Sequence, residues 1–378
     1  MKKVVSFIAA LVAAVSLQAQ ELSLPFPVRD GNQIEWFCTG DDYLASLYAD
    51  LNAAQSFIEG EFYHLYNDGV GKTLQEIFIR KAREGVTVRI LVDGIVNSRI
   101  PKTYFYQMRK AGVEVVFYDD PDDRLWELLD DVQNRTHRKI IVIDHRIGYT
   151  GGMNPIDEVR EWGDVHMRVQ GPVVADLHSL LDQSRVRRKG SDCPVEPVLA
   201  PAGDVTARLI VGGRADYPIL EQLYAQTFQS ARESIWIRTP YFCPPKSILS
   251  ALKEAARRGV DVRIYLPKAS DWPMVDSASK AFYKQLLEAG VHLYYCGGPF
   301  NHAKTFVVDG ALGCAGTVNL DNRSLVINQE DGLFLYGPSA LTFLLEDFAR
   351  TQESATEITK LPFAWPHRYF FLALYPWM

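Results

Sequence analysis

Two stretches of the sequence decide the fold: Thr136–Pro155, THRKIIVIDHRIGYTGGMNP, and Asn301–Leu320, NHAKTFVVDGALGCAGTVNL. Both fit the pattern H-x-K-x4-D-x6-G-x-x-N, and each position of the second copy lies 165 residues after its counterpart in the first. Apolar residues fill the space between Lys and Asp in both copies, so the match reflects a duplication. The matching positions are His137, Lys139, Asp144, Gly151 and Asn154, and His302, Lys304, Asp309, Gly316 and Asn319.

The duplication extends beyond the motif, because apolar strands and amphipathic helices alternate in the same order in both halves. This alternation predicts an α/β fold with two similar domains, mostly parallel central sheets, a pseudo-twofold relation and an active site at the domain interface. In the first half the predicted helices are 41–52, 71–84 and 104–111, and the strands are 55–63, 86–92 and 113–118. In the second half the helices are 220–232, 247–258 and 277–289, and the strands are 233–241, 260–266 and 291–295.

Four segments follow from these patterns. Residues 1–19 carry Lys2 and Lys3 before an apolar run, which is typical of a signal peptide or an N-terminal anchor. The first domain is predicted over 35–195 and the second over 205–355, joined by a charged link rich in Pro and Gly. Residues 361–378 form a tail rich in aromatic residues.

The first half also carries 13 extra residues within Asp119–Arg135, just ahead of its motif. This acidic segment has helical spacing. It either lines the entrance to the site or forms an ordinary surface helix.

Composition narrows the possible functions. The 378 residues carry a formal net charge of −6, which argues against a non-specific nucleic-acid binder. The five cysteines form no C-x-x-C pair, so they do not predict a zinc site, and they are interpreted as buried apolar residues.

Strand geometry divides the motif into two faces. Side chains alternate along a strand, so His137 and Lys139 share one face while Asp144 points the other way. The same parity pairs His302 with Lys304 and separates them from Asp309. A tight turn after each Asp would return Asn154 beside His137 and Asn319 beside His302.

Two such clusters across an interface suit a phosphodiester. Lys139, Lys304, Asn154 and Asn319 can hold the non-bridging oxygens, while one His attacks phosphorus and the other transfers the proton. A nucleophilic His needs an acceptor for its second ring nitrogen, and Asp164 and Glu330 are the candidates. A metal is not expected in these clusters, because a cation would repel the Lys beside each His.

These motifs resemble the phospholipase D superfamily, whose signature is a duplicated H-x-K-x4-D followed by Gly-Ser-x-Asn. Gly152 and Thr317 stand at the Ser position, so only Thr317 keeps a hydroxyl for the phosphate. Within the superfamily the chain is most similar to bacterial cardiolipin synthases. The resemblance spans Glu35 to Arg350 and rests on HRKIIVID, YTGGMN, WGDVHMRVQGPVV, TPYFCPP, HAKTFVVD and GTVNLDNRS.

The resemblance implies a phosphatidyltransferase that works through a phosphohistidine, without a cofactor. It implies a catalytic set of His137, Lys139, Asp144, His302, Lys304 and Asp309, with His137 as nucleophile and His302 as general acid. The implied reaction joins two phosphatidylglycerol molecules into cardiolipin and releases glycerol. A phospholipase D hydrolase, a secreted phosphodiesterase or nuclease, and a lipid-binding protein without activity remain the alternatives.

The implied substrate is a phospholipid, and the implied partner is a membrane surface rather than nucleic acid. The enzymes of this kind usually begin with two transmembrane helices, whereas here there is one signal-like segment. We therefore expect an exported protein at the periplasmic face of a bacterial membrane. The aromatic tail 361–378 either docks on lipid or packs on the domain.

Overall fold

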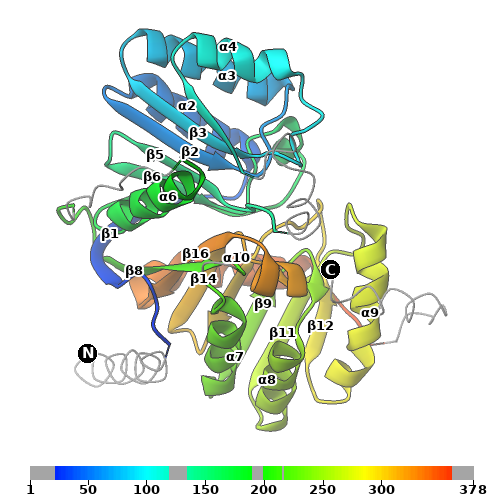
Figure 1. The fold of residues 1–378 in the computed structure, drawn as a ribbon. Coiled ribbons are helices and arrows are strands. Elements are labelled where there is room, and N and C mark those ends of the chain that lie inside the picture. Colours follow the sequence, from blue (N-terminus) through cyan, green and yellow to red (C-terminus); the bar gives the residue numbers. More distant parts are fainter. Residues whose placement is uncertain (1–21, 119–133, 190–198, 215–216, 360–378) are drawn as a thin grey trace.

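The computed structural model describes residues 22–118, 134–189, 199–214 and 217–359 (Figure 1). Signal segment 1–19, tail 361–378, Cys193 and most of the acidic segment Asp119–Arg135 lie outside these ranges. Within the described ranges, no helix is both long and apolar enough to span a membrane.

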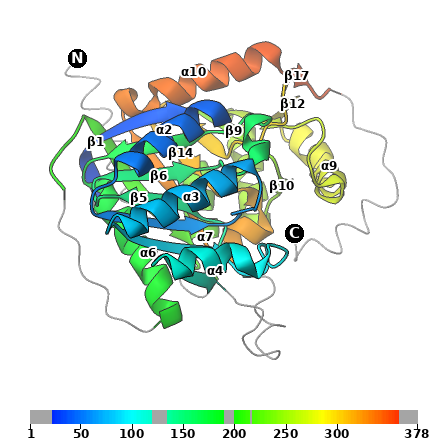
Figure 2. The ribbon, with the colours of Figure 1, turned by 90° about the horizontal axis from the view of Figure 1, so that it is seen from above.

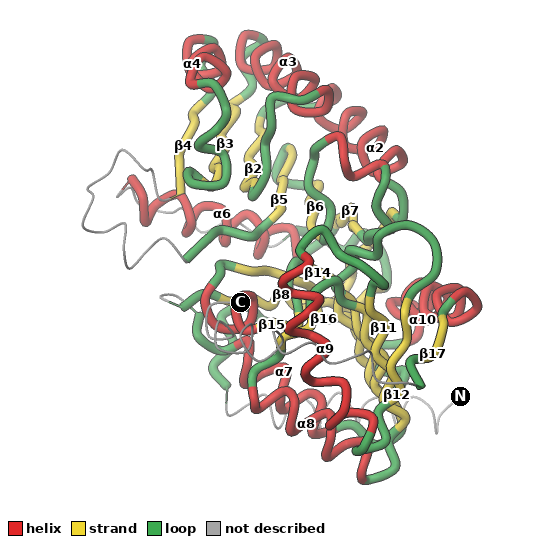
Figure 3. The backbone as a smooth tube through the Cα atoms, turned by 90° about the vertical axis from the view of Figure 1, so that its right-hand side faces the viewer, coloured by secondary structure: helices red, strands yellow, loops and turns green. Residues whose placement is uncertain are grey.

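One mixed sheet of 15 strands runs through both halves of the molecule. In the first half its order is β4-β3-β2-β5-β6-β7-β1, and Figure 3 shows β4 to β7 side by side. In the second half the order from the same centre is β8-β16-β14-β13-β9-β11-β12, followed by β17. The two orders mirror each other about the antiparallel β1–β8 pair, as the predicted pseudo-twofold relation requires.

The first half contains β1 Val28–Phe37, α2 Gly40–Ala53, β2 Phe57–Phe62, α3 Gly69–Arg83, β3 Thr87–Asp93, α4 Lys102–Lys110, β4 Glu114–Tyr118, β5 Lys139–Ile143, β6 Ile147–Gly151, a 3-10 turn Asp157–Arg160, β7 His166–Gln170 and α6 Val173–Lys189. Each helix and strand predicted for this half appears within a few residues of its expected bounds. Gly85, expected to close α3, has a φ of +92°, which suits the left-handed turn that ends a helix.

The second half contains β8 Val205–Gly212, α7 Leu220–Ser230, β9 Ser234–Arg238, β10 Phe242–Cys243, α8 Lys246–Arg257, β11 Asp261–Leu266, α9 Pro273–Leu287, β12 His292–Tyr295, β13 Thr305–Val308, β14 Leu312–Gly316, β15 Leu320–Asp321, a π-helical turn Arg323–Ile327, β16 Glu330–Tyr336, α10 Pro338–Ser354 and β17 Thr356–Glu357. The elements predicted for this half are also present.

Three large hydrophobic cores and one small cluster hold the described layers together. Helices α2, α3 and α4 cover the outer face of the first half (Figure 2), and α7, α8 and α9 cover the second (Figure 1). Helices α6 and α10 lie between the halves, where their apolar faces pack into a shared core with β5, β7, β8 and β16 (Figure 1). Burial of this shared core fixes the two halves against each other.

One detail of the prediction was wrong: the central sheets are not mostly parallel. Within the 15-stranded sheet, parallel pairing is confined to β2–β3–β4 and β9–β11–β12, and the separate β10–β15 pair is also parallel. The strands from β5 to β13 through the centre pair antiparallel, because a hairpin forms within each motif. The bounds of the two domains stay predictions; β1 spans the expected start at residue 35, and α6 ends at Lys189, inside the first domain as predicted.

Candidate functional site

Each motif folds as a β-hairpin closed by its Asp. Asp144 and Asp309 have positive φ values of 48° and 51°, which match the first residue of a tight hairpin turn. Asp144 accepts hydrogen bonds from the backbone N–H groups of residues 55–57, and Asp309 accepts them from residues 232–234. The parity prediction is confirmed: both carboxylates anchor the turn and face away from the His and Lys side chains.

The His and Lys of each motif lie together on the opposite face. The Nζ of Lys139 donates to the carbonyl oxygen of His137 at 2.6 Å, and the Nζ of Lys304 lies 2.7 Å from Nδ1 of His302. All four residues are buried. The charge of Lys304 also acts on His137, so the two clusters meet across the interface.

The backbone of each catalytic His is hydrogen-bonded to the opposite half of the molecule. The N–H of His137 donates to the carbonyl of Gln329 at 2.8 Å, and the N–H of His302 donates to the carbonyl of Gly163 at 2.7 Å. Gln329 and Gly163 donate in return to Arg135 and Phe300. Each His therefore has its backbone fixed by the half that carries the other His.

The predicted acceptors Asp164 and Glu330 bind the His residues in the same reciprocal way. Nδ1 of His137 lies 2.9 Å from Glu330 Oε2, and Nδ1 of His302 lies 2.6 Å from Asp164 Oδ2. These contacts leave Nε2 of each imidazole as the nitrogen that can react. The carboxylates fix the ring tautomer and orientation, as a nucleophile or general acid requires.

The residue that follows the motif Gly, Gly152 or Thr317, lies against the carboxylate that binds a catalytic His. Thr317, expected to bind phosphate, is fully buried, and its hydroxyl donates to Glu330 Oε2 at 2.5 Å. This hydroxyl therefore positions the partner of His137, which corrects the expected phosphate contact. At the equivalent position of the first motif, Gly152 leaves room for Asp164. A Cβ there would lie 2.1 Å from Asp164 Oδ1, in the space that this carboxylate occupies.

Asn154 and Asn319 follow their hairpins into the same buried region, with 5% and 4% of their surface exposed. The carboxamide oxygen of each has no hydrogen-bond partner among the described residues. An amide oxygen accepts hydrogen bonds, so these two oxygens suit a ligand group that donates one, because an unmade hydrogen bond is costly in the interior.

Burial sets the protonation of the cluster. It lowers the pKa of Lys139 to about 7 and that of Lys304 to about 8, and for Lys139 the neighbouring charge of Lys304 adds to the effect. Burial and the lysine charges also hold the pKa of His137 well below its usual value and lower that of His302 to about 4. A bound anion would oppose these shifts, so the charges of the cluster favour an anionic ligand.

The two acceptors differ in charge. Burial raises the pKa of Glu330 to about 7. Burial alone would also raise the pKa of Asp164, but the charges of Lys304 and His302 hold it below its usual value. Lys304 Nζ lies 3.6 Å from Asp164 Oδ2. Asp164 is thus the more strongly ionised of the pair.

An aromatic wall around the site was missed in the sequence. The Tyr63 ring meets His137 edge-on with centroids 4.7 Å apart, and Tyr241 approaches His302 in the same way at 6.3 Å. Trp162 lies 4.8 Å from the His302 ring. A signal was present: Tyr63 and Tyr241 end the two strand segments 55–63 and 233–241, which align with each other.

His64 was missed as well. It lies half-buried beside the cluster, where desolvation and the charge of Lys139 hold its pKa well below the usual value. No repeat marks His64, because Phe242 follows Tyr241 at the equivalent position.

A duplicated His–Lys cluster with reciprocal carboxylates defines the phospholipase D class of phosphodiester-transferring enzymes. A family model described as "Cardiolipin synthase, PLD-like domain" matches residues 47–158 and 224–352. The chain belongs to this family, which confirms the resemblance found in the sequence.

Individual relatives agree with this placement. The chain is 35% identical over 345 residues to a cardiolipin synthase of Geobacillus kaustophilus, covering 88% of this chain and 68% of the relative. A cardiolipin synthase of Geobacillus sp. strain WCH70 is 36% identical over 345 residues, with the same shares covered. The crystal structure of phosphatidylserine synthase from Haemophilus influenzae superposes with a TM-score of 0.72 at 16% identity, over 96% of this chain and 97% of that one, and shows the same fold.

Proposed function

We propose that this chain transfers a phosphatidyl group from one phosphatidylglycerol to another, giving cardiolipin and glycerol. The observation that carries the mechanism is the reciprocal pairing of His137 with Glu330 and of His302 with Asp164. The family supports a phosphatidyltransferase.

In the first step Nε2 of His137 attacks phosphorus, and the bond from phosphorus to the glycerol oxygen breaks. His302 gives the departing oxygen a proton from Nε2, so glycerol leaves as a neutral alcohol. In the second step His302 takes a proton from a hydroxyl of the second phosphatidylglycerol. That oxygen attacks phosphorus, and the bond to His137 breaks.

The assignment of the two roles rests on the acceptors. The ionised Asp164, 2.6 Å from His302, favours an imidazolium there, which is the form that a general acid needs. Asp164 thus opposes the burial that lowers the pKa of His302, and the phosphodiester anion would add a second negative charge beside the ring that acts in the same direction as Asp164. Glu330, with a pKa raised to about 7, favours the imidazolium on His137 less, so His137 stays neutral and nucleophilic.

The lysines and amides hold the phosphoryl group. Lys139 and Lys304 lie on the reacting face and offset the charge on the non-bridging oxygens as it grows in the transition state. Asn154 and Asn319 add neutral donors. Burial removes competing water, which strengthens each of these interactions.

Incubation of the purified protein with phosphatidylglycerol tests the proposal. We expect cardiolipin and an equal amount of glycerol, and loss of both in His137→Ala and His302→Ala. Phosphatidic acid as the only product would replace the transferase with a hydrolase, and cleavage of DNA without lipid turnover would replace both with a nuclease. A fully active His137→Ala would refute the nucleophile.

We also propose that residues around Trp272 bring the site to a lipid surface. Trp272 and Met274 are among the exposed large apolar residues, at 59% and 42%. They follow Asp271, which accepts a hydrogen bond from the Tyr241 hydroxyl at 2.6 Å, beside His302. Trp favours the interface between water and hydrocarbon, so this segment suits a membrane contact at the mouth of the site.

Flotation with phosphatidylglycerol vesicles tests that contact. A Trp272→Ala, Met274→Ala double variant should float less than wild type, while Tyr106→Ala, exposed at 63% on α4, serves as the control. Equal flotation of all three proteins would contradict the proposed membrane contact. Export to the periplasmic face is proposed from residues 1–19 and is tested by fusing them to alkaline phosphatase, which is active only after export.

A further inference from the structure

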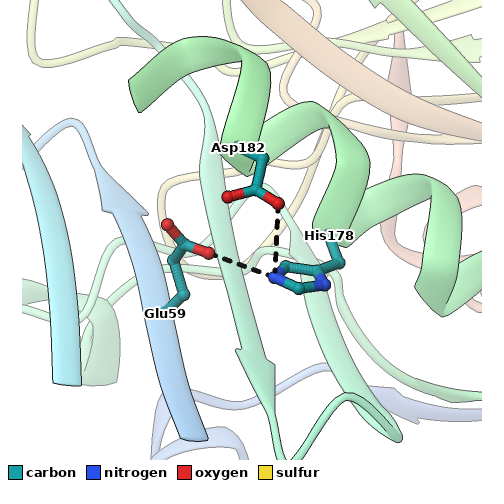
Figure 4. A group of neighbouring side chains, drawn as sticks. All are labelled: Glu59, His178 and Asp182. Carbon is teal, nitrogen blue, oxygen red and sulfur yellow. Dashed lines mark ion pairs between the residues drawn. The ribbon is translucent and has the colours of Figure 1, made fainter. Parts of the chain in front are cut away.

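A second cluster of polar side chains lies in the core between the halves, outside the phosphodiester site. Glu59 projects from β2, while His178 and Asp182 lie one turn apart on the same face of α6 (Figure 4). All three are buried, at 3%, 3% and 1% exposed. Phe57 of the shared core meets the His178 ring edge-on, with centroids 4.9 Å apart.

The three side chains converge on one point. His178 Nε2 lies 3.3 Å from Glu59 Oε2 and 3.7 Å from Asp182 Oδ2, and the three ligand atoms all lie within 4.8 Å of one another (Figure 4). Neither of these two carboxylate oxygens has a hydrogen-bond partner among the described residues. Oxygens left without a hydrogen bond at this depth are costly unless a cation completes them.

The surrounding residues already occupy the other atoms of the cluster. Arg185 lies 3.4 Å from Glu59 Oε1 and 2.9 Å from Asp182 Oδ1, which are the carboxylate oxygens that face away from His178 Nε2. On the far side of the imidazole, Nδ1 of His178 lies 3.3 Å from Nδ1 of His145. These contacts orient the ligands as outer residues do around metal-binding His and carboxylate groups.

We propose that Glu59, His178 and Asp182 bind a divalent metal ion of the zinc class. Ligand atoms about 2.0–2.1 Å from a tetrahedral metal lie roughly 3.3–3.4 Å apart, close to the two measured contacts of His178. One imidazole with two carboxylates favours zinc or a neighbouring transition metal over magnesium or calcium, which prefer oxygen ligands alone. Water supplies the remaining ligand.

Charge also fits such an ion. Two carboxylates and one guanidinium leave the cluster with one net negative charge when His178 is neutral, and a divalent cation brings the total to one positive charge. The competing arrangement is an ion-pair network in which a protonated His178 neutralises the cluster without metal. Metal binding requires a neutral His178 that donates from Nδ1 to His145.

The site would tie α6 to β2 close to the reacting groups without touching them. Ser184, also on α6, accepts a hydrogen bond at 2.8 Å from Arg138, the residue after His137. The metal is therefore assigned a structural task, and its test does not depend on catalysis.

Metal content of the full-length protein tests this proposal. The protein is stripped with a chelator, dialysed against Zn²⁺, Mg²⁺ or Ca²⁺, freed of unbound metal and analysed by mass spectrometry and thermal unfolding. His178→Gln and Glu59→Gln remove one ligand each at similar volume. Asp176→Asn on the same helix, which loses an ion pair to Arg29 outside the cluster, is the matched control.

We expect one equivalent of Zn²⁺ in wild type and in Asp176→Asn, with a rise in Tm on loading. His178→Gln and Glu59→Gln should each bind at least about tenfold more weakly and lose that rise in Tm. Co²⁺ in place of Zn²⁺ should give the visible absorption of a four-coordinate site. Zinc content near zero in wild type, zinc retained by His178→Gln, or a Tm raised by Mg²⁺ alone would overturn the proposal.

Discussion

Asp164→Asn separates the roles of the two His residues. Asp164 is 1% exposed at its side chain, lies 2.6 Å from His302 Nδ1 and is the nearest carboxylate to Lys304, at 3.6 Å. The amide keeps the volume but carries no charge. His302 then loses its ionised partner, and Lys304 loses the charge that holds its own proton in place.

The size of the effect follows from the bond removed. A hydrogen bond to a charged group contributes about 1.5–3 kcal/mol, and each 1.4 kcal/mol is a tenfold change in rate. With glycerol as leaving group, kcat/KM should therefore fall by roughly 10- to 150-fold. The loss should lie toward the upper end, because the pKa of Lys304, already lowered to about 8 by burial, falls further without Asp164.

The assay compares two donors. Phosphatidylglycerol releases an alkoxide that needs a proton, whereas phosphatidyl-p-nitrophenol releases a stable phenolate that does not. Asp164→Asn should lose kcat/KM on the first donor and regain most of it on the second, because kcat/KM reports only the step that forms the covalent intermediate. The same variant should accumulate phosphohistidine on the second donor, since the following step needs His302 as a base.

Glu330→Gln is the matched control on the other His. Its loss should be similar on both donors, because attack by His137 occurs in either case. The opposite pattern, in which Glu330→Gln recovers on phosphatidyl-p-nitrophenol and Asp164→Asn does not, would refute the assignment of His302 as the general acid.

Three further outcomes are expected. Asp144→Asn should cost about 1–2 kcal/mol of unfolding free energy, measured by urea denaturation, with kcat of the folded protein nearly unchanged; a loss of kcat without a loss of stability would place Asp144 in the chemistry. Thr317→Val should lower kcat by about tenfold, while Thr317→Ser, which keeps the hydroxyl bonded to Glu330, should stay close to wild type. Equal kcat values for the two variants would contradict the role of Thr317 in positioning Glu330. Because Lys139 and Lys304 are charged below pKa values of about 7 and 8 and neutral above them, kcat/KM should fall as the pH rises through this range, and a constant rate well above pH 8 would contradict the shifts.

The sequence predicted the elements that carry a strong local signal. Four apolar residues between Lys139 and Asp144 mark a buried strand, and strand parity alone separates the reacting His and Lys from Asp144. The alternation of side chains along a strand was enough to predict this separation. In the structure β5 ends at Ile143, and Asp144 is held in the turn by the backbone N–H groups of residues 55–57.

The reciprocal arrangement could not be predicted in this way. Glu330 lies 193 residues from His137, and Asp164 lies 138 residues from His302. No local sequence pattern indicates which carboxylate binds which His, since each carboxylate could equally bind the His of its own half. The answer depends on the backbone bridges of His137 to Gln329 and His302 to Gly163, which exist only once both halves are packed.

Strand β1 was missed for a different reason. Its sequence VRDGNQIEWF is polar, and only Asn32 and Phe37 of its side chains are fully buried. It is a strand because its backbone pairs with β7 of one half and β8 of the other. Tertiary pairing stabilises this strand, so neither an alternating pattern nor an apolar run in the sequence predicts it.

The reciprocal bonds explain why a duplicated protein requires both copies. A single half would present His137 and Lys139 without Glu330 or Thr317, so the imidazole would be neither oriented nor held in one tautomer. The two copies also differ after duplication. Gly152 leaves space for the short side chain of Asp164, while the Thr317 hydroxyl donates a hydrogen bond to the longer Glu330. Two partners of different length and charge turn a symmetric pair of imidazoles into one that favours attack and one that favours proton transfer. The asymmetry of the reaction thus resides in the acceptors, since the His and Lys residues are the same in both motifs.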